Sequence, residues 1–263
     1  VVMGGRSGTV PAGYSPNLAL GAGMYNDGVA VHVANCVFGL NTAESLGGGF
    51  YSNGGSGMVS SCRFTLNEAA SGAGIYVNGG TLLVQGCGFD ENTAATAGGG
   101  IYANAAQLTL EATSFEVNAA GTGGALRSLG GKRTALDCVF RLNAGSGSGG
   151  AVNVKDVTGS NFEKCLFIGN LAATAGGVYV ETSQLSFKAC AFYGNKAKTG
   201  GGGGLRMVSC SPVLVSDPVN TLENCVFWRN SAFQHGGALA VELSQANITN
   251  GTFQGNALTA ATD

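Results

Sequence analysis

The sequence predicts an all-β protein, folded as a single-stranded right-handed parallel β-helix of about nine to ten coils of about 25 residues each. Three observations carry this prediction: an aromatic-x-x-Asn motif that recurs along the chain, a glycine-rich motif after each asparagine, and short alternating apolar runs between them. We expect one domain over residues 1–263. Its regular coils should span about 14–256, with an insertion at about 203–220.

The aromatic-x-x-Asn motif occurs ten times, from Tyr14–Asn17 to Phe253–Asn256. Successive asparagines lie 24 to 27 residues apart, except for one interval of 35 that contains the insertion. Coils of a β-helix repeat at the inter-strand spacing of ~4.8 Å, so a residue repeated at one position forms a column along the axis. The predicted asparagine column is Asn41, Asn67, Asn92, Asn118, Asn143, Asn170, Asn195 and Asn230. The predicted phenylalanine column is Phe38, Phe64, Phe89, Phe115, Phe140, Phe167, Phe192 and Phe227.

The glycine-rich motif reads GAGI at 72–75 and GGGI at 98–101, and it recurs in the same way along the chain. Paired glycines permit a turn where a Cβ would collide with the next coil. Short runs such as IYVN (75–78) and TLLVQ (81–85) alternate with period two, which indicates strands rather than helices. We expect the phenylalanines to stack inside, and each asparagine to bond its neighbours at a bend, where it tolerates left-handed backbone.

Seven of the eight cysteines share one position of the repeat, two residues before the phenylalanine. They are Cys36, Cys62, Cys87, Cys138, Cys165, Cys190 and Cys225. Two alternatives stay open: buried thiols that serve as small apolar side chains, or oxidised neighbours such as Cys36–Cys62 or Cys138–Cys165. Cys210 lies off this column, and we expect it to be the single cysteine most prone to bonding or reaction.

The alternating GGA-[ILV] and F-x-x-N motifs resemble the repeat that names the polymorphic outer membrane proteins of chlamydiae. The resemblance covers residues 14–256. The resemblance implies the fold of a right-handed parallel β-helix. It also implies a surface-exposed protein with an adhesive or structural role rather than an enzymatic one.

The position directly after each phenylalanine holds Asp90 and Glu116 on neighbouring coils, with Glu91 beside Asp90 and Arg141 one coil further on. Three interpretations are open: a solvated ion ladder, a calcium-type cation site, or an acid–base pair. The two histidines, His32 and His235, are about eight coils apart, too far to share a site. We expect both at the surface.

The same outward column continues with Ile168, Tyr193 and Trp228, which form either a patch for a partner or glycan, or a face covered by the insertion. Sequons at Asn247 and Asn250 are candidate N-glycosylation sites.

The formal net charge of −2 gives no electrostatic reason to expect binding to nucleic acid or anionic lipid, and no apolar run is long enough for a membrane span. We expect no cofactor. The predicted function is a non-enzymatic extracellular structural or adhesive solenoid, secreted or at the cell surface. It would be a filament or appendage subunit that stacks end to end, or part of a longer solenoid, with glycans as further partners. The alternatives are a carbohydrate-active enzyme with its cleft near Asp90, Glu91 and Glu116, or a glycan-binding module.

Overall fold

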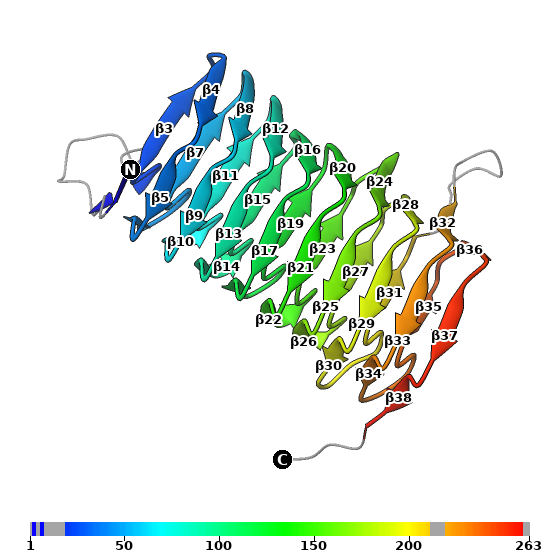
Figure 1. The fold of residues 1–263 in the computed structure, drawn as a ribbon. Coiled ribbons are helices and arrows are strands. Elements are labelled where there is room, and N and C mark those ends of the chain that lie inside the picture. The colour runs from blue at the N-terminus through cyan, green and yellow to red at the C-terminus, as the bar shows by residue number, and fades with distance from the viewer. Residues whose placement is uncertain (1, 4–5, 8–18, 211–218, 260–263) are drawn as a thin grey trace.

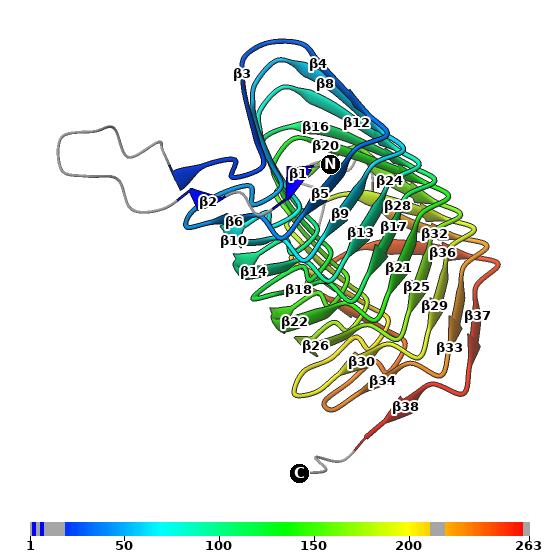
Figure 2. The ribbon, with the colours of Figure 1, turned by 60° about the vertical axis from the view of Figure 1, so that its left-hand side comes forward.

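The computed structural model describes residues 2–3, 6–7, 19–210 and 219–259. The motif copy at Tyr14–Asn17 and residues 211–218 of the insertion lie outside these residues. The described chain forms short strands and no α-helix, and its strands assemble into four parallel sheets that stack as a solenoid (Figures 1 and 2). The predicted all-β solenoid is therefore confirmed. No helix in this part of the chain is suited to crossing a membrane.

Each coil contributes one strand to each sheet in turn, so sheets A, B, C and D are met in that order after the cysteine position. Sheet A follows the cysteines and contains the phenylalanines. It consists of β1 (Val2–Met3), β5 (Val37–Gly39), β9 (Arg63–Thr65), β13 (Gly88–Asp90), β17 (Ser114–Glu116), β21 (Val139–Arg141), β25 (Leu166–Ile168), β29 (Ala191–Tyr193), β33 (Val226–Trp228) and β37 (Thr252–Gln254).

Sheet B follows the asparagines. It consists of β2 (Arg6–Ser7), β6 (Thr42–Ala43), β10 (Glu68–Ser71), β14 (Thr93–Ala97), β18 (Ala119–Ala120), β22 (Ala144–Ser148), β26 (Leu171–Thr174), β30 (Lys196–Ala197), β34 (Ser231–Ala232) and β38 (Ala257–Leu258).

Sheet C follows the glycine motifs. It consists of β3 (Met24–Asp27), β7 (Phe50–Asn53), β11 (Ile75–Asn78), β15 (Ile101–Asn104), β19 (Leu126–Leu129), β23 (Val152–Lys155), β27 (Val178–Glu181), β31 (Leu205–Val208) and β35 (Leu239–Glu242).

Sheet D closes each coil and leads to the next cysteine. It consists of β4 (Val31–Ala34), β8 (Ser56–Ser60), β12 (Thr81–Gln85), β16 (Gln107–Glu111), β20 (Lys132–Leu136), β24 (Ser160–Glu163), β28 (Leu185–Lys188), β32 (Asn220–Glu223) and β36 (Ala246–Thr249). The insertion leaves the coil between β31 and β32, at the corner between sheets C and D.

Residues with left-handed backbone form two corners of a typical coil. One corner residue directly precedes the asparagine, as Leu66 does with a φ of 54°, and the other directly precedes the cysteine position, as Ser61 does with a φ of 51°. The expectation that the asparagine itself adopts this conformation is wrong. Its side chain has to point inward to reach its hydrogen-bond partners, so the preceding residue turns the chain.

The glycine motifs sit where neighbouring coils come closest. A Cβ on Gly99 would lie 2.4 Å from the carbonyl oxygen of Gly124, and one on Gly74 would lie 2.5 Å from that of Gly100. A Cβ on either glycine would force the backbone of these coils to shift, although other coils carry alanine at the same positions, as Ala73 and Ala125 do. The turn brings the next residues, such as Ile75 and Ile101, into the core, where both are fully buried.

Candidate functional site

The asparagine column lies inside the solenoid, and all eight members from Asn41 to Asn230 are fully buried. Nδ2 of Asn92 donates to Oδ1 of Asn118 at 2.9 Å and to the carbonyl oxygen of Phe64 at 2.9 Å. Oδ1 of Asn92 accepts from the backbone N–H and from Nδ2 of Asn67. Both hydrogens and both acceptor positions of the amide are thus used by the scaffold, and none remains for a ligand.

The phenylalanine column stacks directly beside it. Successive rings from Phe38 to Phe227 lie nearly parallel, with centroids 4.5 to 5.0 Å apart. Phe64, Phe89 and Phe115 are fully buried and contact one another in sequence. These rings contribute apolar burial along the whole axis and offer nothing to solvent.

The cysteine column is also in register. The N–H of Leu166 donates to the carbonyl oxygen of Cys138, and the N–H of Ala191 to that of Cys165. All eight cysteines are free thiols, and each except Cys36 is buried. The alternative of oxidised pairs, Cys36–Cys62 or Cys138–Cys165, is therefore not what the structure shows. Thr113 replaces cysteine in one coil and donates, as the thiols do, to the carbonyl oxygen two residues earlier.

Cys210 was expected to be bonded or reactive, and the structure contradicts this. It lies at the interior of the corner after β31, is 2% exposed, and its thiol donates to the carbonyl oxygen of Val208 at 3.2 Å. Burial raises the pKa of the Cys210 thiol, which disfavours the reactive thiolate. Cys210 stands apart in the sequence because it lies at a different corner of the coil from the other seven cysteines. Its side chain is buried there, as are those of the others except Cys36.

The acidic residues of sheet A pair with arginines. Asp90 and Glu116 are in register on β13 and β17, but Oδ2 of Asp90 accepts from Nε of Arg63 at 2.9 Å, and Glu116 pairs with Arg141. Glu91 sits on the exposed corner beside Asp90. Within the described residues, no three His, Cys, Asp or Glu side chains are grouped to hold a metal ion. These residues therefore form an ion ladder, and the structure does not assemble the cation site.

The large apolar and aromatic residues of the same column lie on three adjacent strands of sheet A, with Ile168 and Tyr193 half-buried and Trp228 37% exposed. Tyr193 and Trp228 meet edge to face at 5.7 Å, and the guanidinium of Arg229 lies 4.4 Å from the centroid of the Trp228 ring. Arg229 thus occupies one face of the indole. Whether the insertion covers this patch is a question about residues 211–218, which lie outside the described residues.

Sequence reasoning missed a charged cluster on the outer face of sheet C. Arg206 donates from Nε and Nη2 to the two carboxylate oxygens of Glu242, each at 2.8 Å, and Nε2 of His235 lies 2.8 Å from Oε1 of the same carboxylate. The hydrogen bond from Arg206 is the main cause that lowers the pKa of Glu242. His235 is at the surface, as expected, but it has a partner. His32 is exposed and lies 3.3 Å from Oγ of Ser60.

A tyrosine column on sheet C was missed as well. Tyr25, Tyr51, Tyr76 and Tyr102 stack on consecutive coils, with ring centroids 4.9 to 5.6 Å apart. Burial raises the pKa of Tyr76 to about 12. Each tyrosine directly follows the last residue of a glycine motif, a regularity that the alignment of repeats could have revealed.

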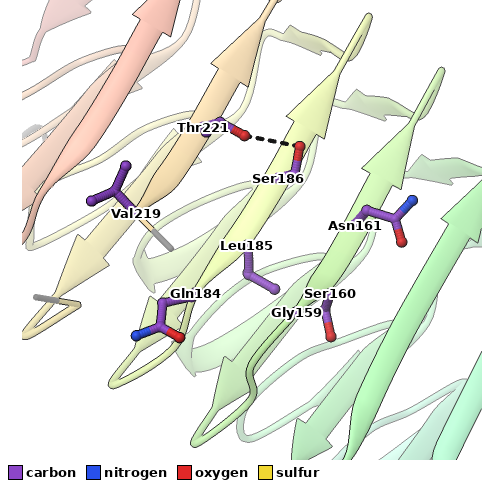
Figure 3. A pocket seen from close by; sticks show the side chains of 8 residues that line it. All are labelled: Gly159, Ser160, Asn161, Gln184, Leu185, Ser186, Val219 and Thr221. Carbon is purple, nitrogen blue, oxygen red and sulfur yellow. Dashed lines mark hydrogen bonds between the residues drawn. The ribbon is translucent and has the colours of Figure 1, made fainter. Parts of the chain in front are cut away.

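A hollow of about 280 Å³ lies on the outer face of sheet D, where the chain re-enters the coil after the insertion (Figure 3). It is lined by Gly159, Ser160, Asn161, Gln184, Leu185, Ser186, Val219 and Thr221. Asn161, Ser186 and Thr221 are in register on β24, β28 and β32, and Thr221 donates to Oγ of Ser186 at 2.9 Å. All lining residues are uncharged.

Residues 89–104 match the family model of the Chlamydia polymorphic membrane protein (Chlamydia_PMP) repeat. The chain carries a PMP-type repeat in a parallel β-helix. The matched segment runs from Phe89 through Asn92 and the glycines at 98–100 to the end of β15, so it contains the parts that build the internal columns. No curated protein and no solved structure gave a match to the chain.

The hollow belongs to none of the positions that define the PMP-type repeat. Counted by strand register, the outward position that holds Asn161, Ser186 and Thr221 holds His32, Met58 and Leu83 in the first coils. The repeat motifs keep the scaffold constant while this outer column changes from coil to coil.

The two sequon asparagines lie in the last described coil of the PMP-type solenoid. Asn247, on β36, and Asn250, at the following corner, are both exposed. Nδ2 of Asn250 donates to Oδ1 of Asn224 at 3.1 Å, whereas the side chain of Asn247 points from the same outer face of sheet D as Thr221. Both are accessible for glycosylation.

Proposed function

We propose that this protein is a non-enzymatic structural or adhesive β-solenoid displayed at a cell surface. The observation that carries the proposal is that the repeated side chains are buried, where they make hydrogen bonds and ring contacts within the solenoid. Asn92, Phe89 and Cys87 are buried, and they bond or stack with their counterparts and with the backbone inside the solenoid. The PMP-type repeat supports a surface location, since the family it names consists of membrane proteins.

The non-enzymatic part of the proposal rests on how the outward ionisable groups are arranged. Asp90 and Glu116 are each paired with an arginine, and Glu242 is held by Arg206. A general acid or base must reach a proton on a bound substrate, whereas each of these carboxylates already bonds a guanidinium group. These residues therefore support a charged, solvated face better than the alternative of a carbohydrate-active cleft near Asp90, Glu91 and Glu116.

The proposal includes contact between solenoid ends. The last described coil exposes apolar side chains that the preceding coils bury, and Phe253 is 46% exposed while it stacks on Phe227. The large apolar residues exposed here whose counterparts in the preceding coil are buried are Val241, Ile248, Phe253 and Leu258. We propose that a second copy stacked end to end covers this face.

Limited protease treatment of intact cells that produce the protein tests the surface location. We expect the protease to cut the protein while a cytosolic marker stays uncut. A membrane-impermeant labelling reagent should likewise label the protein and leave the cytosolic marker unlabelled. Full protection of the protein on intact cells would contradict it.

Incubation of the purified protein with neutral and acidic polysaccharides tests the non-enzymatic part. We expect no new reducing ends and no unsaturated products. Electron microscopy of the same sample distinguishes end-to-end fibres from single short rods. Product release that is lost in an Asp90→Asn or Glu116→Gln variant would favour the enzymatic alternative instead.

A further inference from the structure

We propose that the hollow on sheet D is a binding site for a neutral saccharide residue of a glycan. This deepens the adhesive role proposed above, on which it rests, by naming a site and a class of ligand. The site uses β24, β28 and β32 and is separate from the asparagine, phenylalanine and cysteine columns inside the solenoid.

Gly159 lines the hollow and contributes no side chain to it. Counted by strand register, the position of Gly159 is occupied by Thr81, Gln107 and Lys132 in earlier coils and by Gln184 in the next one. Gly159 has a φ of +63°, and a Cβ built on it would meet no atom within 4 Å. Without a side chain at Gly159, space stays open on the outer surface of this coil. Gln184 and Val219, on the two following coils, border that space (Figure 3).

The polar groups at the hollow suit sugar hydroxyls. Asn161, Ser186 and Thr221 face outward from three adjacent strands, and all three are half-buried. The Thr221 hydroxyl donates to Ser186, so the Ser186 hydroxyl hydrogen is available to a ligand. The side-chain amides of Asn161 and Gln184 form no hydrogen bond with any of the described residues. Amides and hydroxyls both donate and accept, as the hydroxyls of a sugar do.

Charge and size narrow the class of ligand further. No charged residue lines the hollow, so it offers nothing to balance a phosphate, sulfate or uronate group. The outward charges around it are Lys132, at the Gly159 position one coil earlier, and Glu163, Lys188 and Glu223, which lie two positions along β24, β28 and β32 and alternate in sign. The volume of about 280 Å³ is at the lower end of ligand pockets, which favours a single sugar ring over a larger group.

A peptide strand is a poorer fit than a saccharide. Peptides commonly bind to β proteins by adding a strand to an open sheet edge. Each of β24, β28 and β32 is already paired on both sides within sheet D, so the hollow presents side chains and no free backbone edge.

Four variants test the site. Gly159→Asn places a side chain in the hollow, and asparagine tolerates the positive φ. Thr221→Val removes one hydroxyl and keeps the shape of a β-branched strand residue. The matched controls are Gly79→Asn, at a second glycine with positive φ and open surroundings, and Thr109→Val, at the same outward position of sheet D two coils before Asn161. Unfolding midpoints of all four variants verify that each is folded.

The probes are neutral oligosaccharides of glucose, galactose, mannose and N-acetylglucosamine, with an oligogalacturonate as the acidic counterpart. Binding is measured by saturation-transfer NMR and titration calorimetry. We expect at least one neutral series to bind, with little change between low and high salt. Gly159→Asn should lower that affinity by at least about tenfold, and Thr221→Val by about fivefold, whereas both controls should bind as the unmodified protein does.

Three outcomes overturn the proposal: no neutral saccharide binds, the Gly159→Asn variant binds as tightly as the unmodified protein, or only the acidic oligosaccharide binds. None of these outcomes would affect the proposed surface location or the proposed non-enzymatic role. Those two proposals are tested by cell labelling and product analysis, which do not depend on the hollow.

Discussion

The side chain of Asn118 bonds Asn92 twice. Oδ1 of Asn118 accepts from the backbone N–H of Asn92 at 3.1 Å and from Nδ2 of Asn92 at 2.9 Å. Nδ2 of Asn118 then donates to the carbonyl oxygen of Phe89 at 2.8 Å. A single side chain therefore satisfies three groups of the preceding coil at a buried corner.

Replacement of Asn118 by alanine should lower the free energy of unfolding by about 3 kcal/mol or more, because it leaves buried donors on Asn92 and a buried carbonyl on Phe89 without partners. The control is Asn78→Ala, since Asn78 belongs to a partly exposed row of hydrogen bonds with Asn53 and Asn104. Its cost should stay below about 1 kcal/mol, because water replaces the lost partners. Urea denaturation compares the two variants, and equal losses would contradict a structural role for the buried column.

The free cysteines should be unreactive in the folded protein. Burial raises the pKa of the Cys87 thiol to about 11, so little thiolate exists at pH 8, and the surrounding core blocks access. A chromogenic disulfide reagent should label the half-exposed Cys36 first, while all eight thiols of the chain react after denaturation. A Cys36→Ser variant controls for that first reaction. Rapid native labelling of three or more thiols would contradict the buried column.

Val117 is a β-branched residue with a φ of 56° at an exposed corner of the coil. Other coils place Gly169 and Gly194 at the equivalent corner. Left-handed backbone costs a non-glycine residue about 1–2 kcal/mol, so Val117→Asn should stabilise the protein by about 1 kcal/mol. The reverse change, Gly169→Val, should destabilise it by a similar amount. Thermal unfolding measures both, and a lower midpoint for Val117→Asn would show that contacts of the valine outweigh its strain.

Glu242 should contribute to stability at neutral pH and lose that contribution in acid. Its pKa is lower in the folded protein than in the unfolded chain, chiefly because of the hydrogen bond from Arg206. Such a carboxyl group stabilises the fold above its unfolded pKa, and the benefit disappears as the pH falls through its folded pKa. The stability difference between the protein and a Glu242→Gln variant should therefore be largest near pH 7 and shrink below about pH 4.

The control for this pH series is Glu68→Gln, at an exposed position with no ion pair among the described residues. Its stability difference should stay small and nearly constant over the same range. A Glu242→Gln difference that grows on acidification would contradict the assigned ion pair.

The internal columns were predictable from the sequence because a repeat with period one coil places Phe89, Asn92 and Cys87 over their counterparts whatever the detailed shape of the coil. The tyrosine column was predictable in the same way, since Tyr76 and Tyr102 each follow a glycine motif, but only the inward positions were aligned. Which residue turns the corner was not predictable from residue type, because Leu66 and Val117 are unfavourable in left-handed backbone and are held there by the coil.

The outer surface was less predictable. Arg206 and Glu242 are 36 residues apart, and the insertion between them hides their place on adjacent coils. The hollow is lined by Gly159, at a position where other coils carry lysine or glutamine. A missing side chain leaves no motif in a chain with 46 glycines, so only the register of sheet D reveals it.

The most direct test of the central claim, that the repeat builds columns of identical side chains inside a solenoid, is the measurement of proton–proton NOEs between selectively labelled phenylalanine rings. The account predicts cross-peaks from the ring of Phe89 to the rings of both Phe64 and Phe115, whose centroids each lie 4.8 Å away. Absence of both cross-peaks, or NOEs from Phe89 to rings several coils distant, would contradict it.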